Sequence, residues 1–209
     1  IVDISDNAKK LSVKYKIQLQ PNVSSLLNSK ELDAVIVATP NRLHEKHTIS
    51  LLRKKIPVLL EKPISDNIKS AKKIINIAEK NKTPLLIGYH RRHNSIVTEV
   101  KDIIKSGKLG KIISANILCW LYKHDKYFKE KWRISRGGGP LGINLVHDID
   151  MISYLLGSIK YVQAFITNKN RKFKVEDTAT VNFIFDSGAL CTLNTVSYTH
   201  LTLPTKNEV

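Results

Sequence analysis

The stretch LDAVIVATP, residues 32–40, decides the fold class of this chain. It is a largely apolar run, rich in β-branched residues and closed by a proline, which is typical of a strand buried in a parallel sheet. Two more apolar runs follow, Val58–Leu60 and Leu85–Gly88, and segments with helical periodicity separate the three. This alternation predicts βαβ units in an α/β fold with a doubly wound, Rossmann-type parallel sheet.

The segments between these runs carry helix signals of their own. One helix is expected from about His44 to Lys54, and another begins at a cap formed by Ser65 or Asp66 and stops at Asn81. Right-handed crossovers place the carboxyl ends of the strands at one edge of the sheet, where ligands bind. The sequence therefore predicts a ligand site among the residues that follow each strand. These residues are Asp3, Pro40, Lys62 and Gly88.

The pattern changes after about residue 90. Helix faces are expected at residues 96–104 and 145–156, and strands at residues 111–120, 161–167, 178–186 and 189–196. A tight turn at residues 186–188 joins the last two strands, so we expect them to pair antiparallel. Strands in series after an α/β half predict a second, α+β domain with a mostly antiparallel sheet.

These patterns divide the chain into three parts. Residues 1–90 are predicted to form an N-terminally truncated Rossmann domain, and residues 91–197 a partial α/β domain. Residues 198–209 resemble a translated adapter or vector scar, and we expect them to be non-native. The chain opens at Ile1 without an initiator methionine or a basic leader, so we expect a fragment that lacks an upstream glycine-rich turn.

The composition is that of an ordinary globular protein, with 209 residues of which 42% are hydrophobic and 25% are charged. A net charge of +16 would suit a nucleic acid or a membrane surface, but the lysines are scattered over apparent helices. We expect no basic stripe interleaved with aromatic residues, and hence neither of these partners. Cys119 and Cys191 fit free, buried thiols in a reducing compartment, which predicts a cytoplasmic protein.

Two side chains at the predicted sheet edge carry suitable chemistry. Asp3, between a strand and a helix, can accept hydrogen bonds from the ribose hydroxyls of NAD and would repel the 2′-phosphate of NADP. A residue that caps a turn is the alternative for Asp3. Lys62, in the sequence Glu61-Lys62-Pro63, can stabilise negative charge on a substrate oxygen. A surface ion pair is the alternative for Lys62.

A second group of candidates follows the three glycines at residues 137–139, which let a backbone pass close to a ligand. His147 lies near the start of the next helix, and the ordinary pKa of histidine suits a general base for a hydroxyl proton. A histidine bonded to the helix backbone is the alternative. Asn144, three residues earlier, shares the helix face of His147 if the helix reaches back so far.

Two histidine pairs could indicate a metal site. They are His44 with His47 and His90 with His93. Neither pair has a third ligand at a useful spacing, so we expect no metal. The segment Tyr89–His93 is a dense cationic patch, which fits an anionic cofactor or substrate as well as a solvated loop.

Taken in order, these segments resemble the Gfo/Idh/MocA oxidoreductases. The segments that carry the resemblance are Ala38–Asn41 with His44, Glu61–Pro63, Tyr89–Asn94, Lys108–Lys111, Gly137–Asp150 and Val175–Thr178. The resemblance covers about residues 1–197. It implies the reversible oxidation of a hydroxyl on a sugar, cyclitol or related polyol, with substrate binding and oligomerisation assigned to residues 91–197. It also implies a homo-oligomer assembled through the open sheet of the second domain. Asp3 separately predicts NAD in preference to NADP.

The resemblance assigns roles by position. It makes Lys62 the catalytic lysine and His147 the acid/base histidine, both in contact with the substrate. The residues expected to contact the cofactor are Asp3, Thr39, Pro40, Asn41, His44, Glu61 and Lys62. The residues expected to contact the substrate are Lys62, Arg91, Asn144 and His147.

One position departs from the family pattern. Many relatives have an aspartate four residues before the histidine, where this chain has Ile143 beside Asn144. Asparagine can bond a hydroxyl but cannot act as a base, so the acid/base role would fall on His147. A cofactor-binding regulator with the same fold but without turnover is the alternative function, and the presence of both Lys62 and His147 favours the enzyme.

Overall fold

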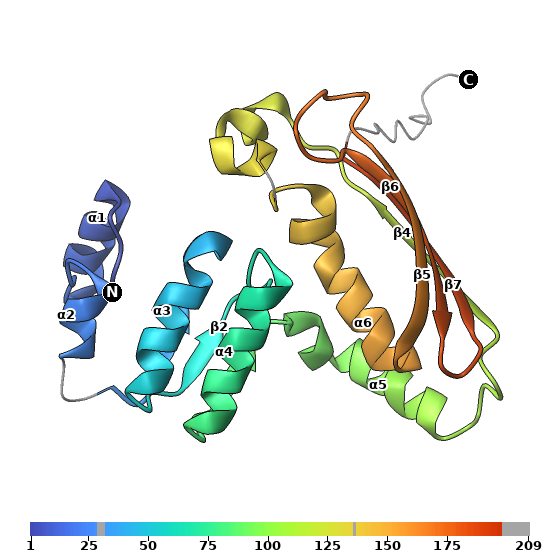
Figure 1. Ribbon diagram of the computed structural model, residues 1–209, viewed down its shortest axis with the longest axis horizontal. Helices are drawn as coiled ribbons and strands as arrows, with labels where there is room; N and C mark the ends of the chain where they lie inside the picture. Colours follow the sequence, from blue (N-terminus) through green and yellow to red (C-terminus); the bar gives the residue numbers. More distant parts are fainter. Residues whose placement is uncertain (29–31, 136, 198–209) are drawn as a thin grey trace, which may run out of the picture. The chain divides into compact units, whose positions relative to one another are not determined.

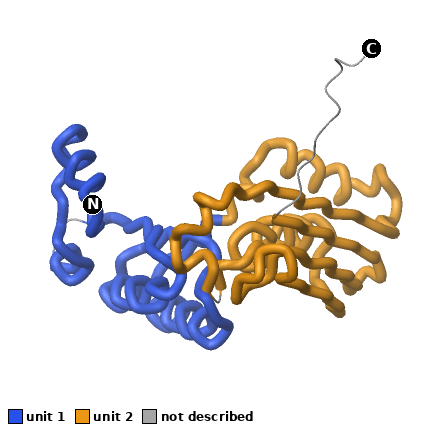
Figure 2. The backbone as a smooth tube through the Cα atoms, turned by 90° about the horizontal axis from the view of Figure 1, so that it is seen from above, with its two compact units in different colours: residues 1–88 blue, residues 89–209 orange. Residues whose placement is uncertain are grey.

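The computed structural model describes residues 1–28, 32–135 and 137–197. The expected non-native tail, residues 198–209, lies outside the described residues. The chain forms two compact units, Ile1–Gly88 and Tyr89–Val209 (Figure 2). Within the described residues, no helix is both long and apolar enough to cross a membrane.

The first unit is built on a sheet of three parallel strands. These are β1 (Val35–Val37), β2 (Val58–Leu60) and β3 (Leu85–Ile87), in that order across the sheet. The predicted parallel pairing is confirmed. Strand β2 matches its predicted run, whereas β1 and β3 are shorter than the runs that predicted them, because only three residues of each have ladder partners.

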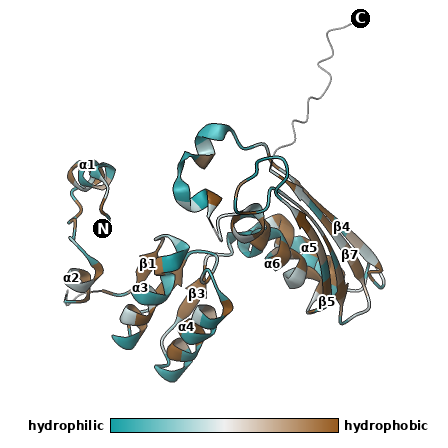
Figure 3. Cartoon of the chain, turned by 45° about the horizontal axis from the view of Figure 1, so that its top comes forward, coloured by the Kyte–Doolittle hydropathy of each residue, from teal (hydrophilic) through white to brown (hydrophobic). Residues whose placement is uncertain are grey.

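Two helices cover one face of this sheet, α3 (Asn41–Arg53) and α4 (Ile68–Lys80) (Figure 1). The buried residues that join them to the strands are Val37, Ile49, Leu51, Leu52, Val58, Leu60, Ile74 and Ala78. The opposite face is open, and Ile36 and Leu86 are each 68% exposed on it (Figure 3). The described residues therefore form a sheet that is covered on one face, where a doubly wound sheet would be covered on both.

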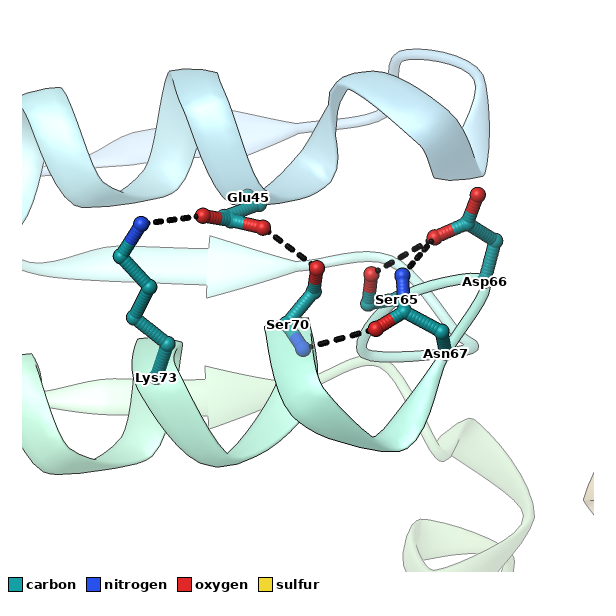
Figure 4. Close-up of polar contacts among 6 residues, drawn as sticks. All are labelled: Glu45, Ser65, Asp66, Asn67, Ser70 and Lys73. Carbon is teal, nitrogen blue, oxygen red and sulfur yellow. Dashed lines mark hydrogen bonds and ion pairs between the residues drawn. The ribbon is translucent and has the colours of Figure 1, made fainter.

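The start of α4 corrects a detail of the sequence analysis. Its N-cap is Asn67, whose side chain accepts a hydrogen bond of 2.9 Å from the backbone N–H of Ser70 (Figure 4). Ser65 and Asp66, the caps that were expected, do not bond to the helix backbone within the described residues but contact each other and Asn67. The Asp66 carboxylate accepts from the Ser65 hydroxyl and from the Asn67 amide, and so orients the true cap.

The N-terminal part of the first unit contains two more helices, α1 (Asp6–Tyr15) and α2 (Val23–Leu27). Ser5 caps α1 by accepting from the backbone N–H of Ala8. The strand expected at the start of the chain is reduced to one parallel bridge between Val2 and Gln20.

The second unit has a four-stranded sheet in the order β4 (Ser114–Trp120), β7 (Leu190–Val196), β6 (Thr178–Phe185) and β5 (Ile159–Thr167). The predicted antiparallel pairing of β6 with β7 is confirmed, and β5 also pairs antiparallel with β6. Strand β4 pairs parallel with β7, so the sheet is mixed and mostly antiparallel. Burial alternates along β6 and β7, as expected for a sheet with one covered face.

The helix α6 (Val146–Leu156) lies along the covered face of this sheet (Figure 1). It follows a π-helical segment, η4 (Leu141–Leu145), and ends at Gly157, whose φ of 96° is accessible to glycine. The buried residues that form the core here are Ile117, Leu145, Ile152, Val181, Phe183, Phe185, Ala189, Cys191 and Leu193.

The remaining elements of the second unit are α5 (Ser95–Lys105) and three short 3₁₀ helices. These are η1 (His90–His93), η2 (Asp125–Lys129) and η3 (Lys131–Ile134). Segments η2 and η3 follow β4 and lead to the three glycines, so they connect the sheet to the start of α6.

Candidate active site

The carboxyl ends of the parallel strands in the first unit form one continuous edge. The backbone N–H of Glu61 donates to Val37 at 2.9 Å, and the N–H of Gly88 donates to Leu60 at 2.8 Å. These bonds hold the residue after β2 and the residue after β3 in line with the sheet. A Cβ atom at Gly88 would lie 3.2 Å from the carboxylate of Glu61, so glycine makes room for that side chain.

His44 connects two of the loops at this edge. Its side chain is completely buried, with Nε2 2.7 Å from the carbonyl oxygen of Thr39 and Nδ1 2.9 Å from that of Pro63. A neutral imidazole has a single N–H and can donate at only one of these contacts. The ring therefore bonds to backbone at the ends of β1 and β2, which supports a positioning role in place of the expected direct contact with the cofactor.

The other expected cofactor residues lie around this buried ring. Thr39 is half-buried, and its hydroxyl lies 3.3 Å from Nδ1 of His47. Pro40 is the N-cap of α3 and Asn41 is the first helical residue, and no side chain caps this helix. Lys62 is half-buried and precedes a cis bond to Pro63.

Asp3 has the geometry of a turn. Its Oδ1 accepts a hydrogen bond of 2.7 Å from the backbone N–H of Ser5, and this bond lowers the pKa of the exposed carboxyl group. Asp3 could therefore serve as a turn cap, as a ligand of the NAD ribose, or as both, because its second carboxylate oxygen can still accept hydrogen bonds.

In the second unit, His147 is the second residue of α6. Two aromatic rings stand edge-on to its imidazole. The His90 ring centroid is 4.8 Å away at an angle of 69°, and the Tyr89 ring centroid is 6.4 Å away at 89°. His147 and Tyr89 are half-buried, whereas His90 is exposed. The motif Tyr89–His93 thus contributes to the surroundings of the histidine predicted as the base.

Two ion pairs attach η1 to α6 on either side of this contact. Arg91 pairs with Asp148, and Arg92 binds both oxygens of Asp150, at 2.8 Å from Nε and 2.5 Å from Nη2. The Asp148 and Asp150 side chains are only 10% and 8% exposed. The hydrogen bond to Asp150 raises the pKa of Arg92, while burial, followed by the charge of Asp150, raises the pKa of the Tyr89 phenol.

The structure also brings together two motifs that the sequence placed far apart. Glu176 accepts a hydrogen bond of 2.9 Å from the backbone N–H of Leu141, at the start of η4. A Cβ atom at Gly139 would overlap the Glu176 carboxylate, and one at Gly138 would lie 2.8 Å from Cα of Arg133. Gly138 is therefore required by the neighbouring backbone, whereas a side chain at Gly139 would displace the Glu176 carboxylate from the segment that leads to the helix carrying His147.

Asn144 lies in the π-helical segment and is half-buried. A π-helix has more residues per turn than an α-helix. The spacing of three residues therefore does not place Asn144 and His147 on one helix face, as the α-helical spacing had predicted. Ile143, the position of the family departure, lies in the same segment.

The segment from Trp120 to Arg133 was not predicted as a functional feature. In this segment basic residues alternate with Tyr122, Tyr127, Phe128 and Trp132, so the expectation that no basic stripe is interleaved with aromatic residues is wrong here. The interleaved letters, WLYKHDKYFKEKWR, were the available signal.

Cys119 and Cys191 are both free thiols, as expected, and burial raises the pKa of each. Cys191 is buried and Cys119 is half-buried. In the part of the chain that the structure describes, no three His, Cys, Asp or Glu side chains are grouped so that they could hold a metal ion.

Comparison with known proteins gives matches over both units. A family model described as an oxidoreductase family with an NAD-binding Rossmann fold matches residues 1–89, and a GFO/IDH/MocA C-terminal domain model matches residues 97–207. A 1,5-anhydro-D-fructose reductase from Ensifer adhaerens is 28% identical over 174 residues, which are 81% of this chain and 52% of that protein. A glucose-6-phosphate 3-dehydrogenase from Bacillus subtilis is 29% identical over 163 residues, which are 75% of this chain and 45% of that protein.

Among solved structures, the WlbA dehydrogenase from Chromobacterium violaceum, in complex with NADH and UDP-GlcNAcA, superposes with a TM-score of 0.88 at 26% identity. The match covers 96% of this chain and 59% of that one. The chain thus spans about half the length of the curated relatives it matches.

Proposed function

The chain belongs to the Gfo/Idh/MocA oxidoreductases, because the two family models together match nearly all of the described residues. On this basis we propose that the whole protein transfers a hydride between NAD and a hydroxyl-bearing carbon of a sugar, cyclitol or related polyol. The proposal concerns the full-length protein, since this chain spans about half of its curated relatives.

The surroundings of His147 carry this proposal. A general base must keep a fixed orientation while its ring stays accessible to the substrate hydroxyl. The edges of Tyr89 and His90 contact the ring, and the ion pairs of Arg91 with Asp148 and Arg92 with Asp150 attach the supporting segment to α6. The imidazole is nevertheless only half-buried, which supports access for a substrate.

The sheet edge of the first unit supports the cofactor part of the proposal. Bound NAD supplies the ring that accepts the hydride from the substrate carbon. The backbone bonds at Glu61 and Gly88 and the first turn of α3, which no side chain caps, provide a polar edge where strands end. The residues that would hold NAD are Asp3, Thr39, Pro40, Asn41, Glu61 and Lys62. His44 would hold the two loops of this edge through its contacts with the carbonyl groups of Thr39 and Pro63.

Within this proposal the proton and the hydride leave the substrate separately. His147 takes the proton of the hydroxyl group, and the Lys62 ammonium donates a hydrogen bond to the oxygen, which stabilises its developing negative charge. The carbon–hydrogen bond then breaks with both electrons, and a carbonyl group remains. Asp3 favours NAD over NADP because its charge opposes a 2′-phosphate.

The substrate class follows from the family and from two relatives named for sugars, an anhydrofructose reductase and a glucose-6-phosphate dehydrogenase. Asn144 and Arg91 would orient the substrate hydroxyls, with Arg91 using the donors that Asp148 leaves available. Residues 1–90 would form the cofactor domain and residues 91–197 the substrate domain of a cytoplasmic homo-oligomer. The break between the two units at Gly88 supports this division.

Turnover of the full-length protein tests the proposal. Oxidation of sugars and cyclitols is followed at the absorbance band of reduced nicotinamide, for the unchanged protein and for Lys62→Met and His147→Asn. Each substitution should lower kcat by about 10²–10⁴-fold, with little change in the affinity for NAD. His93→Asn is the matched control, because His93 is an exposed histidine in the segment Tyr89–His93, whose Tyr89 and His90 contact His147.

Unchanged turnover in His147→Asn would remove the proposed base. Binding of NAD without turnover of any polyol, in the unchanged full-length protein, would favour the regulator.

A further inference from the structure

The segment between β4 and the three glycines forms an open pocket of about 580 Å³. This volume lies within the range of about 300–1,000 Å³ that is typical of small-ligand sites. The residues that line the pocket are Tyr122, Lys123, His124, Lys126, Tyr127, Glu130, Trp132 and Arg133. The side chains of Tyr122, Tyr127 and Trp132 and the basic side chains of Lys123, Lys126 and Arg133 thus accompany a single carboxylate, which gives the pocket an excess of positive charge.

The rings and the cations are arranged around Tyr127. The guanidinium carbon of Arg133 lies 3.9 Å from the centre of the Tyr127 ring, and the Lys123 ammonium lies 4.8 Å from it. Arg133 also donates a hydrogen bond of 2.9 Å to the carbonyl oxygen of Tyr127. The pocket therefore has a cationic side next to aromatic surfaces, a combination that suits an anion attached to a sugar ring.

A buried arginine holds this segment in place. The side chain of Arg171 is 5% exposed and donates to the carbonyl oxygens of Lys123 and Ser197 and to the carboxylate of Asp125. Its own backbone N–H donates at 2.8 Å to Asp177, which is buried. The segment is thereby organised before any ligand arrives, which lowers the entropic cost of binding.

The pocket also adjoins the backbone that leads to His147. Gly138 packs against Trp132 and Arg133, which line the pocket, and the neighbouring Gly139 packs against Glu176 at the start of η4. From that start to His147 the chain makes roughly two helical turns. The pocket is therefore linked, through the packing of Gly138, to the segment that leads into the helix carrying the predicted base.

On this basis we infer that the pocket binds the phosphate group of a phosphorylated sugar, with the sugar ring packed on its aromatic side chains. This inference rests on the proposed function, because it names the substrate class of the proposed reaction. A nucleic acid is a poorer match, because its phosphates need a groove or stripe that continues along many nucleotides. Phosphate esters and nucleoside-diphosphate sugars share the required anion, and the test includes both.

Binding to the full-length protein tests the inference. Isothermal titration is carried out with inorganic phosphate, glucose 6-phosphate and UDP-glucose, and with glucose as the neutral control. At least one phosphorylated sugar should bind roughly tenfold or more tightly than glucose. That binding should weaken as salt is added, because an exposed ionic contact is screened.

A pair of charge reversals locates the site. Lys126 and Lys129 are both exposed and both lie in η2, but only Lys126 lines the pocket. Lys126→Glu should weaken the binding of the phosphorylated sugar by roughly tenfold. Lys129→Glu makes the same change of net charge but does not alter a residue that lines the pocket. It should leave the affinity within about twofold, because salt screens an exposed charge outside the binding site.

Three results would overturn the inference: glucose binding as tightly as every phosphate compound, equal effects of the two reversals, or no effect of Lys126→Glu. The oxidation of neutral polyols is measured on the same preparations. Turnover of polyols without preferential phosphate binding would refute the pocket and keep the proposed function. Phosphate binding that Lys126→Glu abolishes, without turnover of any sugar, would keep the pocket and refute the function.

Discussion

The two units of this protein hold their functional loops by different means. In the first unit the loops lie one residue beyond the ends of parallel strands, where backbone bonds and the buried ring of His44 fix them. In the second unit the candidate segments are held by charged side chains, among them Arg92 on Asp150, Glu176 on Leu141 and Arg171 on the loop after β4.

The difference follows from the geometry of the two sheets. A parallel sheet brings all its strand ends to one edge, so short loops are positioned by the ladder itself. The mixed sheet of the second unit brings no such set of ends together, and its longer connections need side chains from residues distant in sequence. We expect substitutions that remove buried packing to destabilise the loops of the first unit. We expect the loops of the second unit to be destabilised by substitutions that change charge or volume at a few contacts.

The largest effect should come from Gly139→Ala in the second unit. The new methyl group would overlap the Glu176 carboxylate, which must then leave the N–H of Leu141 at the start of η4. We expect a loss of about 3 kcal/mol in the free energy of unfolding of this unit, from overpacking and from a broken charged hydrogen bond. Hydrogen exchange of the α6 amides in the full-length protein measures it, since it reports on this unit separately.

A double-mutant cycle supplies the control for this prediction. Glu176→Ala removes the carboxylate and costs the hydrogen bond alone, so adding Gly139→Ala to it should cost less than about 1 kcal/mol more. Additive losses from the two substitutions would show that Gly139 is required for another reason.

A smaller effect is expected for His44→Leu in the first unit. The leucine fills much of the space but removes the N–H that one of the carbonyl groups of Thr39 and Pro63 accepts, so we expect a loss of about 2 kcal/mol. The loss should not depend on salt, because no ion pair is broken. His47→Leu is the matched control on the same helix, with one contact of 3.3 Å to Thr39, and equal losses would contradict the positioning role of His44.

The smallest effect concerns pH. Burial, followed by the charge of Lys46, lowers the pKa of His47 below the ordinary value of 6.5. As the pH falls through 6.5 the unfolded chain binds a proton at this position before the folded chain does, so this residue makes the protein less stable toward acid.

Replacement by glutamine should therefore flatten the loss of stability between about pH 7.5 and about pH 5.5. Denaturant midpoints of the unchanged and His47→Gln proteins, measured across that range, check the sign. A steeper loss in the variant would mean that His47 gains a proton on folding.

Much of the fold could be predicted because its signals are local. The run Val35–Val37 is apolar and β-branched, and β6 and β7 alternate in hydropathy on both sides of a glycine turn, so strand type and pairing followed. Boundaries were less accurate. Three adjacent polar residues could each have capped α4, and only the backbone geometry selects Asn67. The π-helical segment before α6 has no periodic signal that distinguishes it from α-helix.

The candidate site was predictable only where chemistry and sequence position coincide. Lys62 and His147 stand out by residue type, position and family resemblance. By contrast, the burial of His44 and the contact of Glu176 with the glycines depend on packing between residues far apart in sequence. The pocket after β4 could not be predicted, because lysines scattered over the whole chain hide the local excess of basic residues beside its aromatic rings.

The position of Arg171 in the sequence has a consequence for biosynthesis. The carbonyl group of Lys123 that it binds is made 48 residues earlier. At ~5–20 residues per second, a ribosome needs roughly 2–10 s to cover that distance. During this interval β4 has no strand to pair with, because its partner β7 follows Arg171 in the sequence. The aromatic and basic side chains after β4 also lack the hydrogen bond from Arg171. A nascent chain should therefore depend most on chaperones at this stage, and slow codons before Arg171 would prolong it.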